Sequence, residues 1–222
     1  MWALHDLGRW DEVLRIGDEV LAAAPLGQVS AMVQPMRARV LAQRGDLDGA
    51  AAACAEVSPL VREIGIAQVV GPALPVAAAI AFARGERAEA LALLRELVER
   101  GEATPGLRVW YLDEAVRTAV ALGERALGEE LVANIEPVLE REASAVLGAH
   151  AILAEAAGEP ERAAELYRQV AERWGAYGAV VERAHALAEL GRCAGDDVAA
   201  AEARGVFSSL GVRAPLSDAA TA

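Results

Sequence analysis

The chain has 222 residues, a formal net charge of −12 and 55% hydrophobic residues, of which few are aromatic. Alanine, the strongest helix former, dominates the hydrophobic residues, and strand-favouring residues are sparse, which predicts an all-helical protein. All 21 basic residues are arginine, and the more numerous carboxylates are interleaved with them. The chain therefore lacks the positive face that binding to nucleic acid requires, and the absence of lysine indicates a GC-rich bacterial genome.

A glycine-centred turn recurs along the whole chain. It reads RGDLDGA around Gly45 and RGERAEA around Gly85. The turn glycines are Gly8, Gly45, Gly85, Gly123, Gly158 and Gly195, at intervals of 37, 40, 38, 35 and 37 residues. An acidic residue follows five of them: Asp46, Glu86, Glu124, Glu159 and Asp196. Glycine ends a helix by adopting a left-handed conformation, and an acidic residue stabilises the start of the next helix, so each unit is predicted to be a helical hairpin.

Small residues before and after each turn predict close helix packing. A small or apolar residue stands five positions after each glycine: Val13, Ala50, Ala90, Gly128, Ala163 and Ala200. From the second unit onward, small or apolar residues also stand seven and four positions before it: Ala38, Leu41, Ala78, Ala81, Val116, Ala119, Ala151, Ala154, Ala188 and Gly191. The tripeptide Arg44-Gly45-Asp46 is accordingly interpreted as a turn between helices, and not as an adhesion motif.

One long stretch carries no charge. It runs from Ile64 to Ala83 and contains Pro72 and Pro75. Its length would suit a membrane span, but two prolines in the middle would leave backbone groups unsatisfied in lipid. We therefore expect a loop followed by a buried helix, and no association with a membrane.

The repeated turn resembles that of the tetratricopeptide repeat, whose two antiparallel helices join through Gly-Asp-aromatic-x-x-Ala. The closest copy is LGRWDEVLRIGDEVLAAAP, with Trp10 in the aromatic position and Pro25 at the terminal proline. The resemblance implies an α-solenoid of about five and a half hairpins, with a right-handed superhelix, over residues 1–211. The other copies depart from the family in the aromatic position, and the intervals exceed the family's period of about 34 residues.

The end of the chain resembles the close of the helical-repeat region in large bacterial ATP-binding LuxR-type regulators and multidomain nucleotidyl cyclases. The matching residues are Phe207, Leu210, Gly211 and Pro215. We expect residues 212–222 to form a disordered tail. Because only about seven residues precede Gly8, the first hairpin is incomplete, and we expect the chain to be a fragment of a longer protein.

Tetratricopeptide-like arrays bind partners in the groove formed by the first helix of each hairpin. The family's register, counted from the turn glycines, gives these groove residues: Arg39, Trp110, Asp113, Arg117, Glu155, Glu182, His185, Glu189 and Arg192. Trp110 and Arg117 are the expected anchors, since tryptophan and arginine dominate binding hot spots. The alternative is that Trp110 packs between hairpins and that the charges are only solvated. Trp10 and Trp174 are expected to fill space between helices.

No motif for catalysis, metal binding or a cofactor is present. His5, His150 and His185 do not pair with another histidine or a cysteine at metal-ligand spacing, so we expect no metal. Carboxylate pairs such as Asp113-Glu114 are interpreted as solvated helix faces. The distant Cys54 and Cys193 are expected to be free thiols in a reducing cytoplasm.

The sequence therefore predicts a non-catalytic protein-interaction or ligand-sensing segment of a bacterial signalling or transcriptional regulator. Its partner would be a protein, a peptide or another domain of the same protein. Two alternatives remain: the regulatory arm of a multidomain nucleotidyl cyclase or signalling ATPase, and a self-associating scaffold.

Overall fold

The computed structural model describes residues 1–24 and 27–213, and this part of the chain is all-helical, without a strand. Consecutive helices pack against each other along the chain. The helices are α1 Trp2–Asp6, α2 Trp10–Ala23, α3 Gln28–Gln43, α4 Leu47–Ile64, α5 Ala67–Ala83, α6 Arg87–Ala103, α7 Leu112–Ala121, α8 Arg125–Val132, α9 Glu140–Ala156, α10 Pro160–Tyr177, α11 Val180–Ala194 and α12 Asp197–Leu210, with a 3₁₀ turn, η1 Pro105–Leu107, between α6 and α7.

The turn glycines end helices through backbone geometry. All six have a positive φ, between 66° and 89°, a region that glycine enters without a Cβ clash. At Gly45, the N–H of the glycine donates to Ala42 O, and the N–H of Asp46 donates to Leu41 O. These two bonds define the Schellman motif, which satisfies the last carbonyls of a helix. Gly178 and Gly211 end α10 and α12 in the same way, although the repeat pattern did not single them out.

The acidic residues after the turn glycines do not all act as caps. Asp46 Oδ1 accepts a hydrogen bond from Gly49 N at 2.9 Å, and Asp196 Oδ1 accepts from Val198 N and Ala199 N. The side chain of Glu124, at the equivalent position before α8, makes no such bond. Glutamate has one more methylene than aspartate, so its carboxylate does not take the short capping geometry that aspartate favours.

We expect Asp46→Ala to lower the free energy of unfolding by about 1 kcal/mol, because the N-terminal N–H groups of α4 lose their side-chain acceptor. Urea denaturation followed by circular dichroism measures this. Glu124→Ala is the matched control and should change stability by less than about 0.5 kcal/mol. Equal losses in the two variants would contradict the capping role of Asp46.

Helix α5 corrects one expectation from the sequence. The stretch from Ile64 to Ala83 was expected to begin with a loop, but only Gly65 and Ile66 lie outside helices, and Pro72 and Pro75 are inside α5. Proline removes a helical hydrogen bond, so tertiary packing must hold this helix together. It does so because α5 contacts α3, α4, α6 and α7, and most of its residues are buried. Among the described residues, no helix is both long and apolar enough to cross a membrane.

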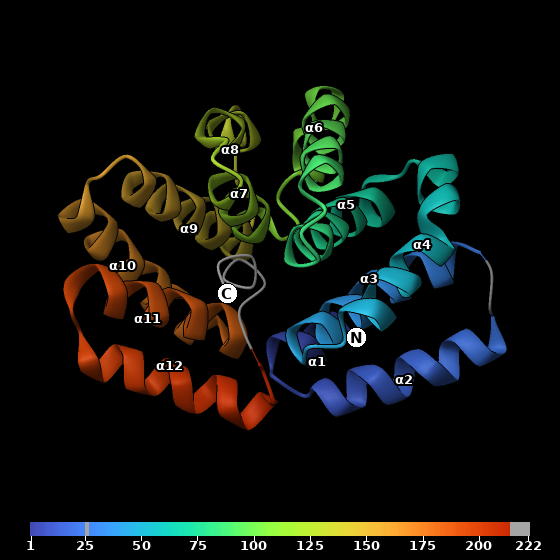
Figure 1. Ribbon diagram of the computed structural model, residues 1–222, viewed down its shortest axis with the longest axis horizontal. Coiled ribbons are helices and arrows are strands. Elements are labelled where there is room, and N and C mark those ends of the chain that lie inside the picture. The colour runs from blue at the N-terminus through green and yellow to red at the C-terminus, as the bar shows by residue number, and fades with distance from the viewer. Residues whose placement is uncertain (25–26, 214–222) are drawn as a thin grey trace.

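The helices curve round so that the two ends of the described chain meet. Figure 1 shows α2 and α12 approaching each other from opposite ends of the sequence. Arg44 Nε donates to Leu210 O at 3.1 Å, and Arg213 N donates to Gln43 O at 3.0 Å. Trp10 and Val13 are buried in one apolar cluster with Val40, Val181 and Leu210. We call this contact the closure.

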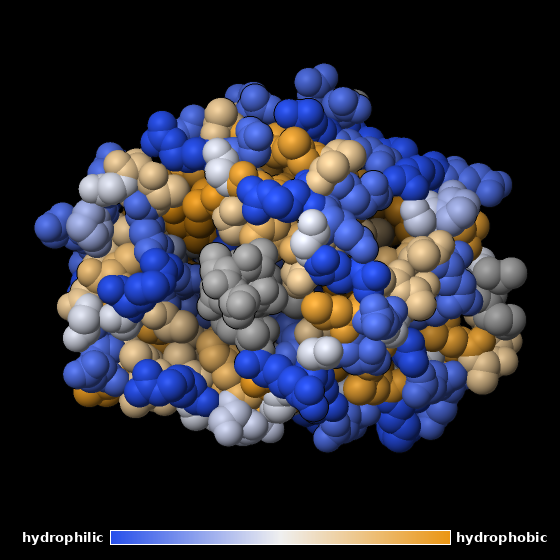
Figure 2. Space-filling view, viewed as in Figure 1, coloured by the Kyte–Doolittle hydropathy of each residue, from blue (hydrophilic) through white to orange (hydrophobic). Residues whose placement is uncertain are grey.

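Two tryptophans and the end of the described chain complete the packing. Trp10 and Trp174 are both buried, which confirms that they fill space between helices. Val212, expected to begin the tail, packs on the closure, while Pro25, Pro215 and residues 214–222 lie outside the described residues. On the face shown in Figure 2, hydrophilic side chains predominate and apolar side chains show between them.

Candidate binding face at the centre of the helices

Most of the expected groove residues fall into two neighbouring groups on what we call the inner face, formed by α1, α3, α7, α9 and α11. One group is buried and surrounds Arg39. The other lines an open pocket around Arg117 and Arg192. The two groups differ in burial, and therefore in how readily a partner could reach them.

The buried group, the central cluster, consists of His5, Asp6, Arg39, Tyr111, Glu114 and Glu182. Arg39 Nε donates to Glu114 Oε2 at 2.6 Å, and its Nη1 donates to Glu182 Oε1 at 3.3 Å. The same Nη1 lies 2.9 Å from His5 Nε2, and Arg39 Cζ lies 4.3 Å from the centre of the Tyr111 ring. Arg39 thus joins three helices through one guanidinium, which presents several donors in a fixed plane.

Burial and neighbouring charges shift the pKa of Arg39 in opposite directions. Burial alone would lower the pKa of Arg39, but the carboxylates of Glu114 and Glu182 outweigh burial and hold the pKa above its usual value. Burial also raises the pKa of Tyr111. Both groups therefore keep their usual protonation state at neutral pH.

The hydrogen bonding of the central cluster is incomplete. Glu114 Oε1, Glu182 Oε2 and the Tyr111 hydroxyl are buried without a hydrogen-bond partner. A buried polar atom of this kind destabilises the fold, because it has lost its hydrogen bonds to water and makes none with the protein. The cluster is therefore a place where an additional group could be bound.

Trp110 lies beside the central cluster and is already covered. Its ring centre lies 4.4 Å from that of Trp2, and Arg141 Cζ lies 5.4 Å from its centre. On its other side, Gly71 leaves room for the indole. This environment favours the packing alternative for Trp110 over its expected role as an exposed anchor.

The second group, the charged pocket, has a volume of about 290 Å³. Arg117 Nε donates to Glu189 Oε1 at 3.1 Å, and Arg192 pairs with both Glu155 and Glu189. The Tyr167 hydroxyl donates to Glu155 Oε2 at 2.9 Å, while Val120 and Ile152 supply apolar wall. Four expected groove residues therefore line one pocket, and their charges balance.

The remaining expected residues lie between the two groups. Asp113 is half-buried, and its Oδ1 accepts a hydrogen bond from Glu114 N. The ring of His185 lies 5.0 Å from that of Phe207. Burial, together with the positive charges of Arg117 and Arg39, holds the pKa of His185 well below its usual value, so this histidine is neutral at pH 7.

Sequence reasoning missed four residues of the inner face: Trp2, His5, Asp6 and Tyr111. Its interpretation of Glu114 as part of a solvated helix face was wrong, because Glu114 is buried against Arg39. Two of the four missed residues carried a usable signal. Trp2 and His5 stand six and three positions before Gly8, the offsets that selected Arg117 and Arg192 in later units. The short first unit concealed them, because its upstream helix has only five residues.

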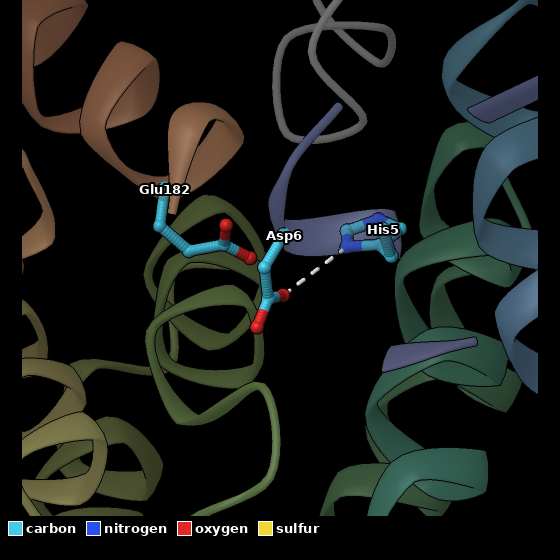
Figure 3. A group of neighbouring side chains, drawn as sticks. All are labelled: His5, Asp6 and Glu182. Carbon is cyan, nitrogen blue, oxygen red and sulfur yellow. Dashed lines mark ion pairs between the residues drawn. The ribbon is translucent and has the colours of Figure 1, made fainter. Parts of the chain in front are cut away.

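Three residues of the central cluster have the chemistry of metal ligands. His5, Asp6 and Glu182 each offer one ligand atom, and these atoms lie within 4.8 Å of one another (Figure 3). Spacing in the sequence could not indicate this group, because Glu182 belongs to α11 while the other two belong to α1.

Two larger pockets lie away from the inner face. One, of about 530 Å³, is lined by α8, α9 and α10 and includes the exposed His150, and the other, of about 480 Å³, is lined by α4, α5 and α6 and includes Cys54. Burial raises the pKa of the Cys54 thiol to about 12, so very little thiolate is present at pH 7. Comparison of the chain with protein-family models, curated proteins and solved structures gave no match.

Proposed function

We propose that this chain is a tetratricopeptide-like, right-handed α-solenoid that binds a protein or peptide segment on its inner face. It acts as a non-catalytic interaction or ligand-sensing segment of a cytoplasmic bacterial signalling or transcriptional regulator. The support for the repeat is the recurrence of one turn geometry, with positive φ at all six glycines. The support for the binding role is the inner face itself.

The observation that carries the proposal is the charged pocket. Arg117, Glu155, Glu189 and Arg192 were selected from the sequence by their offsets alone, and all four line one pocket. An array whose groove collects side chains from successive hairpins suits an extended peptide, which contacts several units at once.

The charges of the pocket favour a peptide over a polyanion. Most arginines of the described chain pair with carboxylates, and both arginines of the pocket do so. Breaking the ion pair between Arg192 and Glu155 costs little free energy, because the Arg192 side chain is 60% exposed and solvated ion pairs contribute little to stability. A peptide carboxylate could therefore replace Glu155 as the ion-pair partner of Arg192, while the apolar wall of the pocket contacts neighbouring peptide side chains.

The test is selection of random peptides on the immobilised chain, followed by measurement of their dissociation constants by fluorescence anisotropy. We expect Arg192→Ala to weaken the selected peptides about tenfold, because the variant loses a charged contact that the fold itself does not need. Arg204→Ala, on the exposed side of α12, is the control and should bind them unchanged. The proposal is wrong if no peptide is enriched, or if Arg192→Ala binds the selected peptides as tightly as the unaltered chain.

A further inference from the structure

The central cluster contains more negative than positive charge. Its carboxylates are Asp6, Glu114 and Glu182, and the guanidinium groups facing them belong to Arg39 and Arg141, so three negative charges meet two positive ones. The contact between Arg141 and Asp6 is long, at 3.9 Å. Among the described residues, Asp6 thus has only this long contact with a guanidinium, which leaves its carboxylate available to a further positive partner.

His5 reaches the central cluster from α1. His5 is fully buried, and Arg39 Nη1 lies 2.9 Å from its Nε2. A ring nitrogen that carries no proton has a lone pair available to a ligand.

The geometry between His5 and Asp6 suits a shared ion better than a direct bond. His5 Nδ1 lies 3.6 Å from Asp6 Oδ1, which is too long for a hydrogen bond. Two ligands that each lie about 2.0–2.1 Å from a tetrahedral ion are about 3.4 Å apart. Figure 3 shows the Glu182 carboxyl pointing toward Asp6, and the three ligand atoms lie within 4.8 Å of one another.

Glu182 supplies an independent observation that points to a ligand. The residue is only 4% exposed, and its Oε2 has no hydrogen-bond partner. Because the other oxygen is the one that accepts from Arg39, Oε2 is available to an ion without loss of that pair.

We propose that His5, Asp6 and Glu182 bind one divalent transition-metal ion such as Zn²⁺. One imidazole and two carboxylates form a ligand set of the kind that Zn²⁺ and Mn²⁺ accept. Binding through Nδ1 places the ring proton on Nε2, so Arg39 gives up its contact with His5 and keeps those with Glu114 and Glu182. The ion joins α1 to α11 and so reinforces the closure between the two ends of the described chain.

The untagged chain is first treated with EDTA, and the EDTA is then removed. The experiment is a calorimetric titration of Zn²⁺ into this metal-free chain. We expect one ion per chain, and a rise in Tm of roughly 5–10 °C at a hundredfold excess of free ion over its dissociation constant. His5→Gln and Asp6→Asn should each weaken binding at least tenfold, whereas His150→Gln should bind like the unaltered chain.

Thiol binding is separated from the proposed site by two further measurements. The double variant Cys54→Ser/Cys193→Ser should retain the ion, and Co²⁺ in the unaltered chain should show visible bands of nitrogen and oxygen ligation without a thiolate charge-transfer band. The Co²⁺ spectrum decides the matter even where a ligand variant fails to fold. Absence of saturable binding, a thiolate band, or unchanged affinity in folded His5→Gln would overturn the proposal.

Discussion

Replacement of Arg39 by methionine is expected to lower the free energy of unfolding by about 3–5 kcal/mol, the usual cost of removing one partner from a buried ion pair. Arg39 is 2% exposed, and it is the common partner of Glu114 and Glu182. Its removal leaves two buried carboxylates without their guanidinium. Equilibrium urea denaturation, with tryptophan fluorescence and circular dichroism as independent probes, measures the loss.

Two further variants distinguish this electrostatic cost from a loss of packing. Arg204→Met changes an exposed arginine and should alter stability by less than about 0.5 kcal/mol. In the triple variant Arg39→Met/Glu114→Gln/Glu182→Gln, the buried charges are gone as well, so much of the lost stability should return. A loss below about 1 kcal/mol in Arg39→Met would show that water reaches the cluster.

Local features of the fold could be predicted from the sequence because each depends on neighbouring residues. A glycine such as Gly45 ends a helix through its own backbone conformation and two nearby hydrogen bonds. The offsets from these glycines then select residues on one helical face. That is why Arg117 and Arg192, 75 positions apart in the sequence, line the same pocket.

The closure and the partners of each charge could not be predicted in this way. Arg39 and Glu182 are 143 positions apart and meet because the helices curve round over the described chain (Figure 1). A single sequence contains no measure of that curvature. The same limit explains α5, where contacts with four other helices override the prolines that indicated a loop.

The closure also changes what the inner face can bind. In an open groove, Trp110 would be an anchor for a partner, but here Trp2 of the same chain covers it. Arg39 likewise donates to carboxylates of the chain itself. Under the proposed function, a partner would bind in the charged pocket, where Arg192 is exposed, or would displace Trp2 from Trp110.

The position of Trp110 depends on Gly71, and Gly71→Ala is expected to destabilise the chain by about 1–3 kcal/mol through overpacking. A Cβ at this position would lie 2.6 Å from Trp110 Cδ1 and 2.7 Å from the backbone oxygen of Leu107. Because one of these atoms belongs to the backbone, rotation of a side chain cannot relieve the contact. The better helix propensity of alanine, about 1 kcal/mol, offsets only part of the cost.

The matched control makes the same chemical change where space is open. Gly205 lies inside α12, and a Cβ there would meet nothing within 4 Å, so Gly205→Ala should stabilise the chain by about 0.5–1 kcal/mol. Urea denaturation of both variants tests whether the changes in the free energy of unfolding have opposite signs. A shift of the tryptophan emission maximum in native Gly71→Ala would report the displaced indole of Trp110. If both variants gain stability, η1 and Trp110 move aside at little cost, and the packing of Trp110 against Trp2 is weak.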